Sequence, residues 1–328
     1  MKEEKINRTH TRKIGWWLTG AGVALIGAIA WSAQVGVVHF SWNEMWQSPI
    51  FWNLRLPRIV LCVLVGAVLS VSGAAYQSIF RNPLTDPYIL GVSSGASLGA
   101  AVAILIGLEN YAYGVGGCAL MAALLTVLAI YHIASIGNRM HTSTLLLTGV
   151  CFTFLITAII SFLMVLHQDK MESIIFWTMG SFASASWNDV ILLTPIAVVG
   201  MCIVRFYAKD LNLLLAGSES AKSMGVEVEK VKRALLLVTT LMVAFAVSTC
   251  GVIGFVGLVV PHCVRIITGA DNRKVIPLSI LSGGLLMVMC DTLARTILPP
   301  SELPVGSLTA LIGAPLFIYL LYRNKRGC

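Results

Sequence analysis

Charged residues are scarce in this chain of 328 residues, where Asp, Glu, Lys and Arg together make up 12%. Typical soluble domains carry about 25% charged residues, which they need to cover a surface that faces water. A soluble enzyme is therefore excluded. Hydrophobic residues make up 57% of the chain and its mean hydropathy is +0.84. Because one membrane span needs about 20 apolar residues, the composition predicts a protein that crosses the bilayer many times.

Several chemical signatures are also missing. There is no phosphate-binding G-x-x-x-x-G-K-[ST] loop, no H-E-x-x-H zinc motif and no EF-hand loop. The eight cysteines form no C-x-x-C pair, so neither a disulfide framework nor a zinc site is implied. No Asp, Glu or Lys lies near the middle of a predicted span, although ion-coupled transporters usually need such a group. We therefore expect no catalytic residue, no metal and no cofactor in this chain, and a transport pathway driven by an external motor.

The formal net charge is +8, but the basic residues lie between apolar runs and form no single patch. This arrangement favours a bilayer over a nucleic acid as the partner. Residues 1–13, MKEEKINRTHTRK, form a basic stretch in front of a long apolar run with no signal-peptide cleavage site. We expect a basic cytoplasmic tail over residues 1–13 and a retained first span.

Long uncharged stretches predict where the chain crosses the membrane. We expect the stretch that ends at Val204 to continue past Arg205, and the stretch that ends at Met289 to extend toward Leu298. One stretch, Ala234–Val264, is long for one span and short for two. The full set is Ile14–Val37, Ile59–Phe80, Tyr88–Leu108, Tyr111–Ile136, Ser143–Leu166, Val190–Val204, Ala234–Val264, Val275–Met289 and Val305–Tyr322.

The distribution of Lys and Arg decides between one and two spans in Ala234–Val264. If the chain turns back at the glycine-rich Cys250–Gly254, there are ten spans, and 19 of the 23 basic residues lie on the side of both termini. A single span would divide them 14 to 9. Cytoplasmic loops carry an excess of Lys and Arg, so we expect an all-α polytopic membrane protein with ten transmembrane helices and both termini cytoplasmic. The basic residues left outside are Arg55, Arg58, Lys170 and Arg295.

Two further features each allow two interpretations. The apolar run Ile174–Trp187 is too short to span and is either an interfacial loop or a short helix at the mouth of a pathway. His262 could suggest a metal or haem ligand, but it has no second ligand at suitable spacing, which favours a hydrogen-bonded structural histidine. His39 and His167 are expected outside, where a solitary histidine is weak evidence for haem.

External arginines are unusual, because the positive-inside rule disfavours them. Arg55 and Arg58 lie three residues apart before the second span. Arg295 follows Asp291 by four residues, a helical spacing that lets the carboxylate orient the guanidinium group. One interpretation is that these arginines anchor the chain at the membrane surface. The other is that they form an exposed docking site for a charged partner.

Four sequence blocks, in order, carry a resemblance to a known family. They are L-R-L-P-R from Leu54, R-N-P-L-T-D-P-Y-I-L-G-V-S-S-G-A from Arg81, G-F-V-G-L-V-V-P-H from Gly254 and E-L-P-V-G from Glu302. Together they resemble the FecCD-type permeases, the transmembrane subunits of bacterial ABC importers for ferric siderophores, haem and cobalamin. The resemblance covers about residues 50 to 325. It implies a single transmembrane permease domain over residues 1–328, with ten helices per subunit.

The resemblance also implies roles for residues at matching positions. Arg55, Arg58 and Arg295 match external arginines that pair with glutamates of a substrate-binding protein. Four other residues match positions that line a cytoplasmic gate, although they could equally be turn and N-cap residues. These gate residues are Asn82, Leu84, Thr142 and Ser143.

The segment 211–226 lies between the sixth and seventh predicted spans. Ser218 is a natural N-cap, Glu219 suits the positive end of a helix, and Gly225 suits a left-handed position after its end. An ordinary capped loop helix explains this pattern equally well. In the family this element is the coupling helix, in which Glu219, Ala221 and Gly225 would contact the ATPase.

The resemblance thus implies a permease subunit in a bacterial cytoplasmic membrane. Its partners would be a second permease subunit (an identical copy or a paralogue), two ATPase subunits that bind ATP and magnesium, and an extracytoplasmic binding protein. The alternatives are a secondary transporter driven by an ion gradient, an intramembrane enzyme and a non-transporting receptor. The choice among haem, siderophores and cobalamin stays open, as does the type of host.

Overall fold

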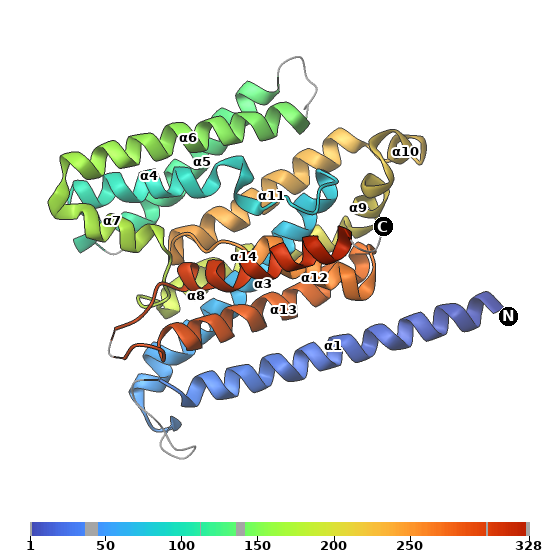
Figure 1. The fold of residues 1–328 in the computed structure, drawn as a ribbon, viewed down its shortest axis with the longest axis horizontal. Coiled ribbons are helices and arrows are strands. Elements are labelled where there is room, and N and C mark those ends of the chain that lie inside the picture. Colours follow the sequence, from blue (N-terminus) through green and yellow to red (C-terminus); the bar gives the residue numbers. More distant parts are fainter. Residues whose placement is uncertain (1, 37–44, 112, 136–141, 300, 326–328) are drawn as a thin grey trace.

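The computed structural model describes residues 2–36, 45–111, 113–135, 142–299 and 301–325, and in these ranges the chain forms helices and no strand (Figure 1). The α-helices are α1 Lys2–Gln34, α3 Leu56–Ile79, α4 Val92–Leu105, α5 Gly114–Ala134, α6 Thr142–Leu166, α7 Met171–Thr178, α8 Trp187–Phe206, α9 Ala208–Ala216, α10 Ser218–Ser223, α11 Val228–Cys250, α12 Val256–Thr268, α13 Asn272–Ala294 and α14 Val305–Lys325. Short π- or 3₁₀-helical turns are η1 Phe51–Arg55, η2 Pro87–Leu90, η3 Leu108–Asn110 and η5 Gln168–Lys170.

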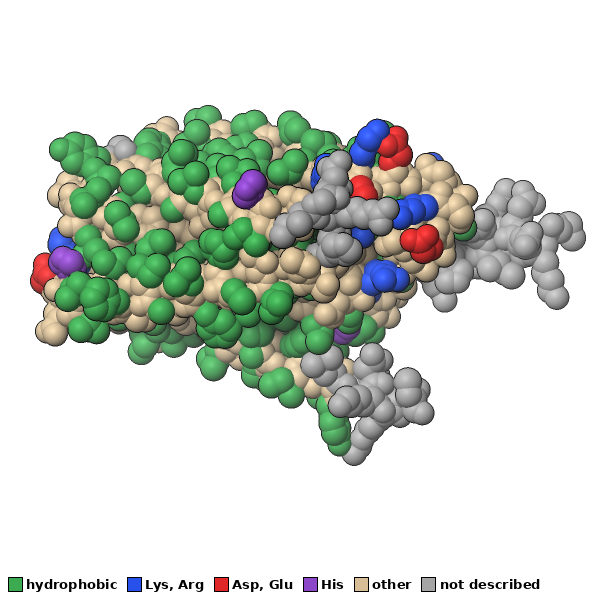
Figure 2. All heavy atoms as spheres, turned by 90° about the horizontal axis from the view of Figure 1, so that it is seen from above, with side chains coloured by type: hydrophobic (Ala, Val, Ile, Leu, Met, Phe, Trp, Pro, Cys, Tyr) green, Lys and Arg blue, Asp and Glu red, His purple; other side chains and the backbone are tan. Residues whose placement is uncertain are grey.

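The long helices lie roughly along one axis, and α1 begins at the same end of the bundle at which α14 ends (Figure 1). We call this end, which carries α9 and α10, the inner end, and the opposite one the outer end. On the face in Figure 2, hydrophobic side chains cover the middle of the molecule, and most charged side chains gather at the inner end. A band of apolar surface between two polar ends is the pattern of a protein that crosses a bilayer.

Seven helical stretches of the described chain are long and apolar enough to cross a membrane, and three further apolar helices are shorter. The seven are Gly15–Gln34, Phe51–Ile79, Gly114–Ala134, Thr142–Leu166, Trp187–Phe206, Val228–Cys250 and Asn272–Ala294, and the shorter ones are Val92–Leu105, Val256–Thr268 and Val305–Leu320. The all-helical class is confirmed, whereas the count of ten spans stays a prediction. Residues 2–13 form the first turns of α1.

Helix α3 is the central helix of the bundle, and its neighbours α12 and α13 approach it through glycine. A Cβ atom on Gly73 would overlap the carbonyl oxygen of Gly257 in α12. A Cβ atom on Gly66 would likewise overlap the carbonyl oxygen of Gly283 in α13. Small residues permit such close packing in membrane proteins, where lipid supplies no hydrophobic drive between helices. The glycines of this sequence thus build a tight α3–α12–α13 core.

Two of the short α-helices, α4 and α12, follow segments that are not α-helical and that meet inside the bundle. The stretch Tyr88–Leu108, predicted as one span, is not one continuous helix: η2 ends at Leu90, Gly91 takes φ +73, and α4 begins only at Val92. The interruption lies at Gly91, because a left-handed backbone does not continue an α-helix and glycine adopts it without steric cost. The predicted break at Cys250–Gly254 is confirmed, since α11 ends at Cys250 and α12 begins at Val256.

A single hydroxyl group joins these two segments. Tyr88 Oη donates to the carbonyl oxygen of Ile253 at 3.1 Å, and the Ile253 amide nitrogen lies 3.3 Å from Tyr88 Oη. Backbone N–H and C=O groups that lie outside a helix at the depth of the bilayer need hydrogen-bond partners within the protein. Tyr88 supplies both partners to Ile253, which makes a broken helix tolerable at this depth.

The ends of α8 and α7 bear on two further predictions. The extension past Arg205 is confirmed, because α8 ends at Phe206. Of the two interpretations of Ile174–Trp187, a short helix is confirmed for the first part, because α7 ends at Thr178, and its place at the mouth of a pathway stays a prediction.

Candidate functional site

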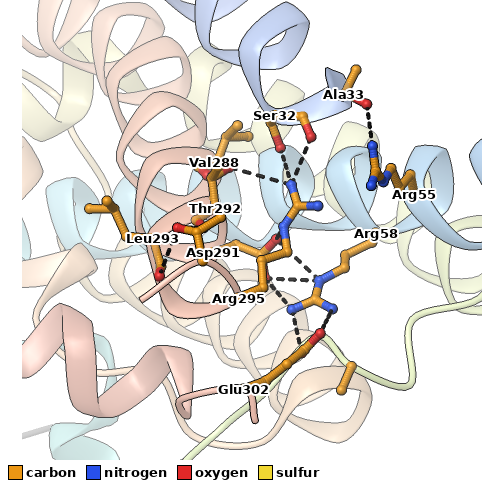
Figure 3. A network of polar contacts seen from close by, with 12 residues as sticks. Ser32, Ala33, Arg55, Arg58, Val288, Asp291, Thr292, Leu293, Arg295 and Glu302 are labelled. Atoms are coloured by element: carbon orange, nitrogen blue, oxygen red, sulfur yellow. Dashed lines mark hydrogen bonds and ion pairs between the residues drawn. The ribbon is translucent and has the colours of Figure 1, made fainter. Parts of the chain in front are cut away.

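A network of charged side chains joins several elements at the outer end of the bundle (Figure 3). Arg58, in the first turn of α3, donates two hydrogen bonds to Asp291 of α13, from Nε at 3.0 Å and from Nη2 at 2.8 Å. The same guanidinium group donates to both carboxylate oxygens of Glu302, at 3.0 and 2.9 Å. Forked arginine–carboxylate pairs fix orientation as well as distance. Arg58 therefore ties α3 to α13 and to the segment that leads into α14.

The other two arginines extend this network to α1. Arg295 Nη2 donates to the Ser32 carbonyl oxygen at 2.9 Å and to Ser32 Oγ at 2.6 Å. Its Nε lies 3.4 Å from Asp291 Oδ2, which confirms the predicted i, i+4 pairing. Arg55 Nη1 donates to the carbonyl oxygen of Ala33 at 2.7 Å. The last turn of α1 thus accepts hydrogen bonds from both guanidinium groups, which satisfies carbonyl groups that a helix end leaves unpaired.

The sequence led us to expect exposed arginines, and the structure differs. Arg55 is 7% exposed and Arg295 is 5% exposed. The reason is that both guanidinium groups have partners inside the protein: Arg55 donates to Ala33, and Arg295 pairs with Asp291 and donates to Ser32. All three guanidinium-bearing residues nevertheless line a surface pocket of about 260 Å³, together with Glu302. The pocket, and not an exposed patch, is where a partner could reach them.

Several charged residues line this pocket. Of the described lining residues, Arg55, Arg58 and Arg295 carry a positive charge and Glu302 carries a negative charge. Burial lowers the pKa of Arg295, and Asp291 acts in the opposite direction. A Cβ atom on Gly36 would lie 2.8 Å from Arg55 Nη2 and 3.3 Å from Arg295 Nη1, so two like charges face the same small residue. A pocket lined by guanidinium groups suits an anionic group.

The four predicted gate residues come from two segments. Asn82 and Leu84 are exposed in the turn after α3, where Asn82 Oδ1 accepts a hydrogen bond from the Leu84 amide at 2.9 Å. Thr142 and Ser143 begin α6, and Ser143 is exposed. The turn role of Asn82 is confirmed by this bond. The gate role stays a prediction.

The predicted coupling segment folds as two short helices at the inner end, α9 and α10. Ser218 is not the N-cap: Gly217 takes that position with φ +133, and Ser218 is the first residue of α10. Gly225 has φ +85, as the sequence indicated. The Glu219 side chain is 91% exposed, whereas Ala221 is fully buried. Of the three predicted coupling residues, Glu219 and Gly225 are therefore the two that lie open to a partner, and contact with an ATPase stays a prediction.

A polar cluster at the inner end was not predicted from the sequence. Arg265 of α12 donates from Nη2 to the carbonyl oxygen of Ala74, to Ser78 Oγ and to Asn272 Oδ1, at 2.8 to 3.0 Å. The positive-inside rule placed Arg265 on this side but could not pair it, because Ser78 lies 187 positions earlier in the sequence. This cluster fastens α12 to α3 and α13 at the inner end.

His262 packs against an aromatic ring. Its imidazole ring lies 5.6 Å from the ring of Phe317 in a T-shaped contact, which supports a structural role. His167 Nδ1 lies 3.2 Å from the carbonyl oxygen of Leu163, and His39 lies outside the described residues. Within the described ranges, no three His, Cys, Asp or Glu residues are placed to hold a metal ion.

Comparison with known proteins adds a family to this geometry. The model of the FecCD transport family matches residues 23–323. The cobalamin import permease BtuC of Halobacterium salinarum is 46% identical over 83% of this chain and 73% of its own length. The hemin transport permease HmuU of Yersinia pestis is 37% identical over 90% of this chain and 91% of its own. The Fe(3+) dicitrate transport permease FecD of Escherichia coli is 36% identical over 92% and 97%.

A solved structure gives the same answer for the fold. It is described as an inward-facing conformation of a metal-chelate type ABC transporter, and it superposes with a TM-score of 0.86 at 32% identity. The alignment covers 93% of this chain and 98% of that one. On its sequence and on its fold, this multi-pass membrane protein is a transport permease that belongs to the FecCD family.

Proposed function

We propose that this chain is the membrane-spanning permease subunit of an ABC importer for a metal chelate, namely a ferric siderophore, haem or cobalamin. The observation that carries the proposal is the FecCD match across residues 23–323, together with relatives that are permeases for cobalamin, hemin and Fe(3+) dicitrate. Ten spans, made of the seven long and three short apolar helices, would place both termini in the cytoplasm. The membrane would be the cytoplasmic membrane of a bacterium.

The outer pocket is the proposed docking site for a substrate-binding protein. Its lining of guanidinium groups suits an acidic side chain, which could enter the pocket and contact Arg55, Arg58 and Arg295. A carboxylate bound there would contact residues of η1, α3 and α13 at once. Docking would therefore act on several helices together.

The inner end would receive two ATPase subunits, which supply ATP hydrolysis with magnesium. Glu219 and Gly225 of the 211–226 segment offer the exposed contact points. ATP-driven closure of the ATPase subunits would move α9 and α10 and change which end of the pathway is open. Asn82, Leu84, Thr142 and Ser143 would line the inner gate. A second permease subunit, identical or paralogous, would complete the pathway.

The experiment is ligand uptake by cells that lack this chain and by cells in which it is restored. Labelled haem, a panel of ferric siderophores and cobalamin are offered separately. Restored uptake of one ligand would identify the substrate within the proposed class. If the restored chain is present in the membrane with its partners and none of these ligands enters, the metal-chelate assignment is overturned.

The docking site is tested by removing the guanidinium group of Arg55, which lines the pocket and donates to the carbonyl oxygen of Ala33. Arg55→Gln should weaken binding of the binding protein to the permease. Lys170→Gln, which removes a charge in the connection between α6 and α7, is the matched control. Equal, unchanged binding in both variants would contradict docking through this pocket.

A further inference from the structure

Helix α8 presents a ridge with a groove on each side. Val198, Cys202 and Phe206 follow one another at four-residue spacing along the helix, and all three border both grooves. The groove toward α11 has a volume of about 700 Å³, and the groove toward α13 has a volume of about 850 Å³. Phe206 is 78% exposed. The ridge and its grooves therefore lie open on the apolar surface of the bundle.

The groove toward α11 continues away from the inner end. A neighbouring apolar hollow of about 310 Å³ shares Val199, Ile203 and Val238 with it and reaches Pro195. From Pro195 to Phe206 the helix rises about 16 Å, at 1.5 Å per residue. One leaflet of a bilayer has a hydrocarbon depth of about 15 Å. The groove toward α11, with its continuation, thus has the length of one acyl chain and lies in the inner half of the bundle.

Positive charge gathers where the grooves reach the inner end. Arg205 and Lys209, four residues apart, line the groove toward α13, and both are exposed. No ion pair or hydrogen bond joins either side chain to another described residue. Asp210 also lines this groove, so the mouth carries two positive charges and one negative charge. Basic pockets between membrane helices on the cytoplasmic side bind anionic lipid headgroups.

We propose that α8 carries a binding site for one anionic diacyl phospholipid of the inner leaflet. The headgroup phosphate accepts hydrogen bonds from Arg205 and Lys209, and the two acyl chains lie on either side of the Val198–Cys202–Phe206 ridge. Two parallel apolar grooves that share one ridge and end at a pair of cations match the shape and charge of a diacyl lipid. A single partner helix would fill one groove and leave the other open.

The test measures binding of phosphatidylglycerol and of phosphatidylcholine to the purified full-length chain by native mass spectrometry in detergent. The double variant Arg205→Gln/Lys209→Gln removes the headgroup contacts. Its control, Lys222→Gln/Lys230→Gln, removes the same charge from α10 and α11, where both lysines are exposed and pair with glutamates of their own helix segment. Because each cation near the membrane surface contributes about a factor of five, the first variant should bind phosphatidylglycerol about 30-fold more weakly. The control should bind as the wild type does.

A second pair of variants tests the grooves. Ala234→Phe places a ring into the groove between α8 and α11, to which Ala234 contributes. Ala24→Phe adds the same ring to the exposed face of α1. We expect at least a tenfold loss of phosphatidylglycerol binding in the first variant and none in the second.

Three results would overturn the proposal. The first is equal binding of both lipids to the wild type, and the second is undiminished phosphatidylglycerol binding in Arg205→Gln/Lys209→Gln. The third is a polypeptide bound to the purified chain in place of the lipid, which Ala234→Phe displaces and the other variants do not. None of these measurements depends on substrate uptake, so the lipid site and the importer assignment are tested separately.

Discussion

Replacing Arg58 by Gln should destabilise the protein strongly, because Asp291 would lose its forked partner. The Asp291 side chain is 1% exposed, and its remaining ionic neighbour, Arg295, lies at 3.4 Å. Breaking a buried pair by removing one partner costs about 3–5 kcal/mol, since the other charge stays buried without compensation. Asp291→Asn should cost a similar amount, because Arg58 and Arg295 would both lose the carboxylate with which they pair.

The double variant Arg58→Gln/Asp291→Asn separates pairing from packing. If the two side chains stabilise each other, the double variant loses less than the sum of the single losses, with a coupling of about 1–3 kcal/mol. The assay is reversible unfolding in mixed detergent micelles, followed by far-ultraviolet circular dichroism. Lys170→Gln is the control, because its pair with Glu109 at 2.6 Å is about one-third exposed on both sides. Exposed pairs contribute only about 0–1 kcal/mol.

Two results would refute this reasoning. The first is a loss in Arg58→Gln no larger than the loss in Lys170→Gln. The second is strict additivity of the single variants, which would mean that Arg58 and Asp291 act independently. Either result would leave the network without a structural role, and the preorganised docking pocket would lose its physical basis.

Three further predictions concern other parts of the chain. Gly73→Ala should lower the free energy of unfolding by about 1–3 kcal/mol, because its Cβ meets the backbone of Gly257, whereas Gly20→Ala, with open space around it, should not; both are read from the same unfolding titration. Burial raises the pKa of Asp86, in the loop between α3 and α4, to about 6. The folded chain then binds this proton more tightly than the unfolded chain, so the wild type should lose stability as the pH rises from about 4 to 6, and Asp86→Asn should lack this slope in melts across that range. Glu219→Arg should leave stability within about 0.5 kcal/mol but abolish stimulation of ATP hydrolysis in the assembled transporter; full stimulation would remove Glu219 from the ATPase contact.

The long spans could be predicted because uncharged length and the placement of Lys and Arg are local signals. The break at Cys250–Gly254 followed from glycine and from charge counting, and the helix ends at Cys250. The late start of α4 could not be predicted from hydropathy, because Tyr88–Leu108 is uncharged throughout. The interruption lies at Gly91, and the turn before it is held by a contact with a residue distant in sequence, Tyr88 Oη with Ile253.

The outer site was partly predictable for a similar reason. The i, i+4 spacing of Asp291 and Arg295 identified one pair. The pairing of Arg58 with Glu302 joins residues 244 positions apart, and the contact of Arg295 with Ser32 joins residues 263 positions apart. The two motifs that contain Arg58 and Glu302 carry opposite charges on the same predicted side of the membrane. That was the only indication in the sequence that these two residues could pair. Burial of the arginines depends on these tertiary contacts, which no local pattern encodes.

The central claim is that ATP hydrolysis drives uptake through this chain, and the most direct test separates the two energy sources of the cell. Uptake of the ligand that the restored chain imports is measured under ATP depletion with the proton gradient intact, and under an uncoupler with ATP maintained. The account predicts that uptake stops on ATP depletion and continues with the uncoupler. Uptake that survives ATP depletion and collapses with the gradient would contradict it and would indicate a secondary transporter.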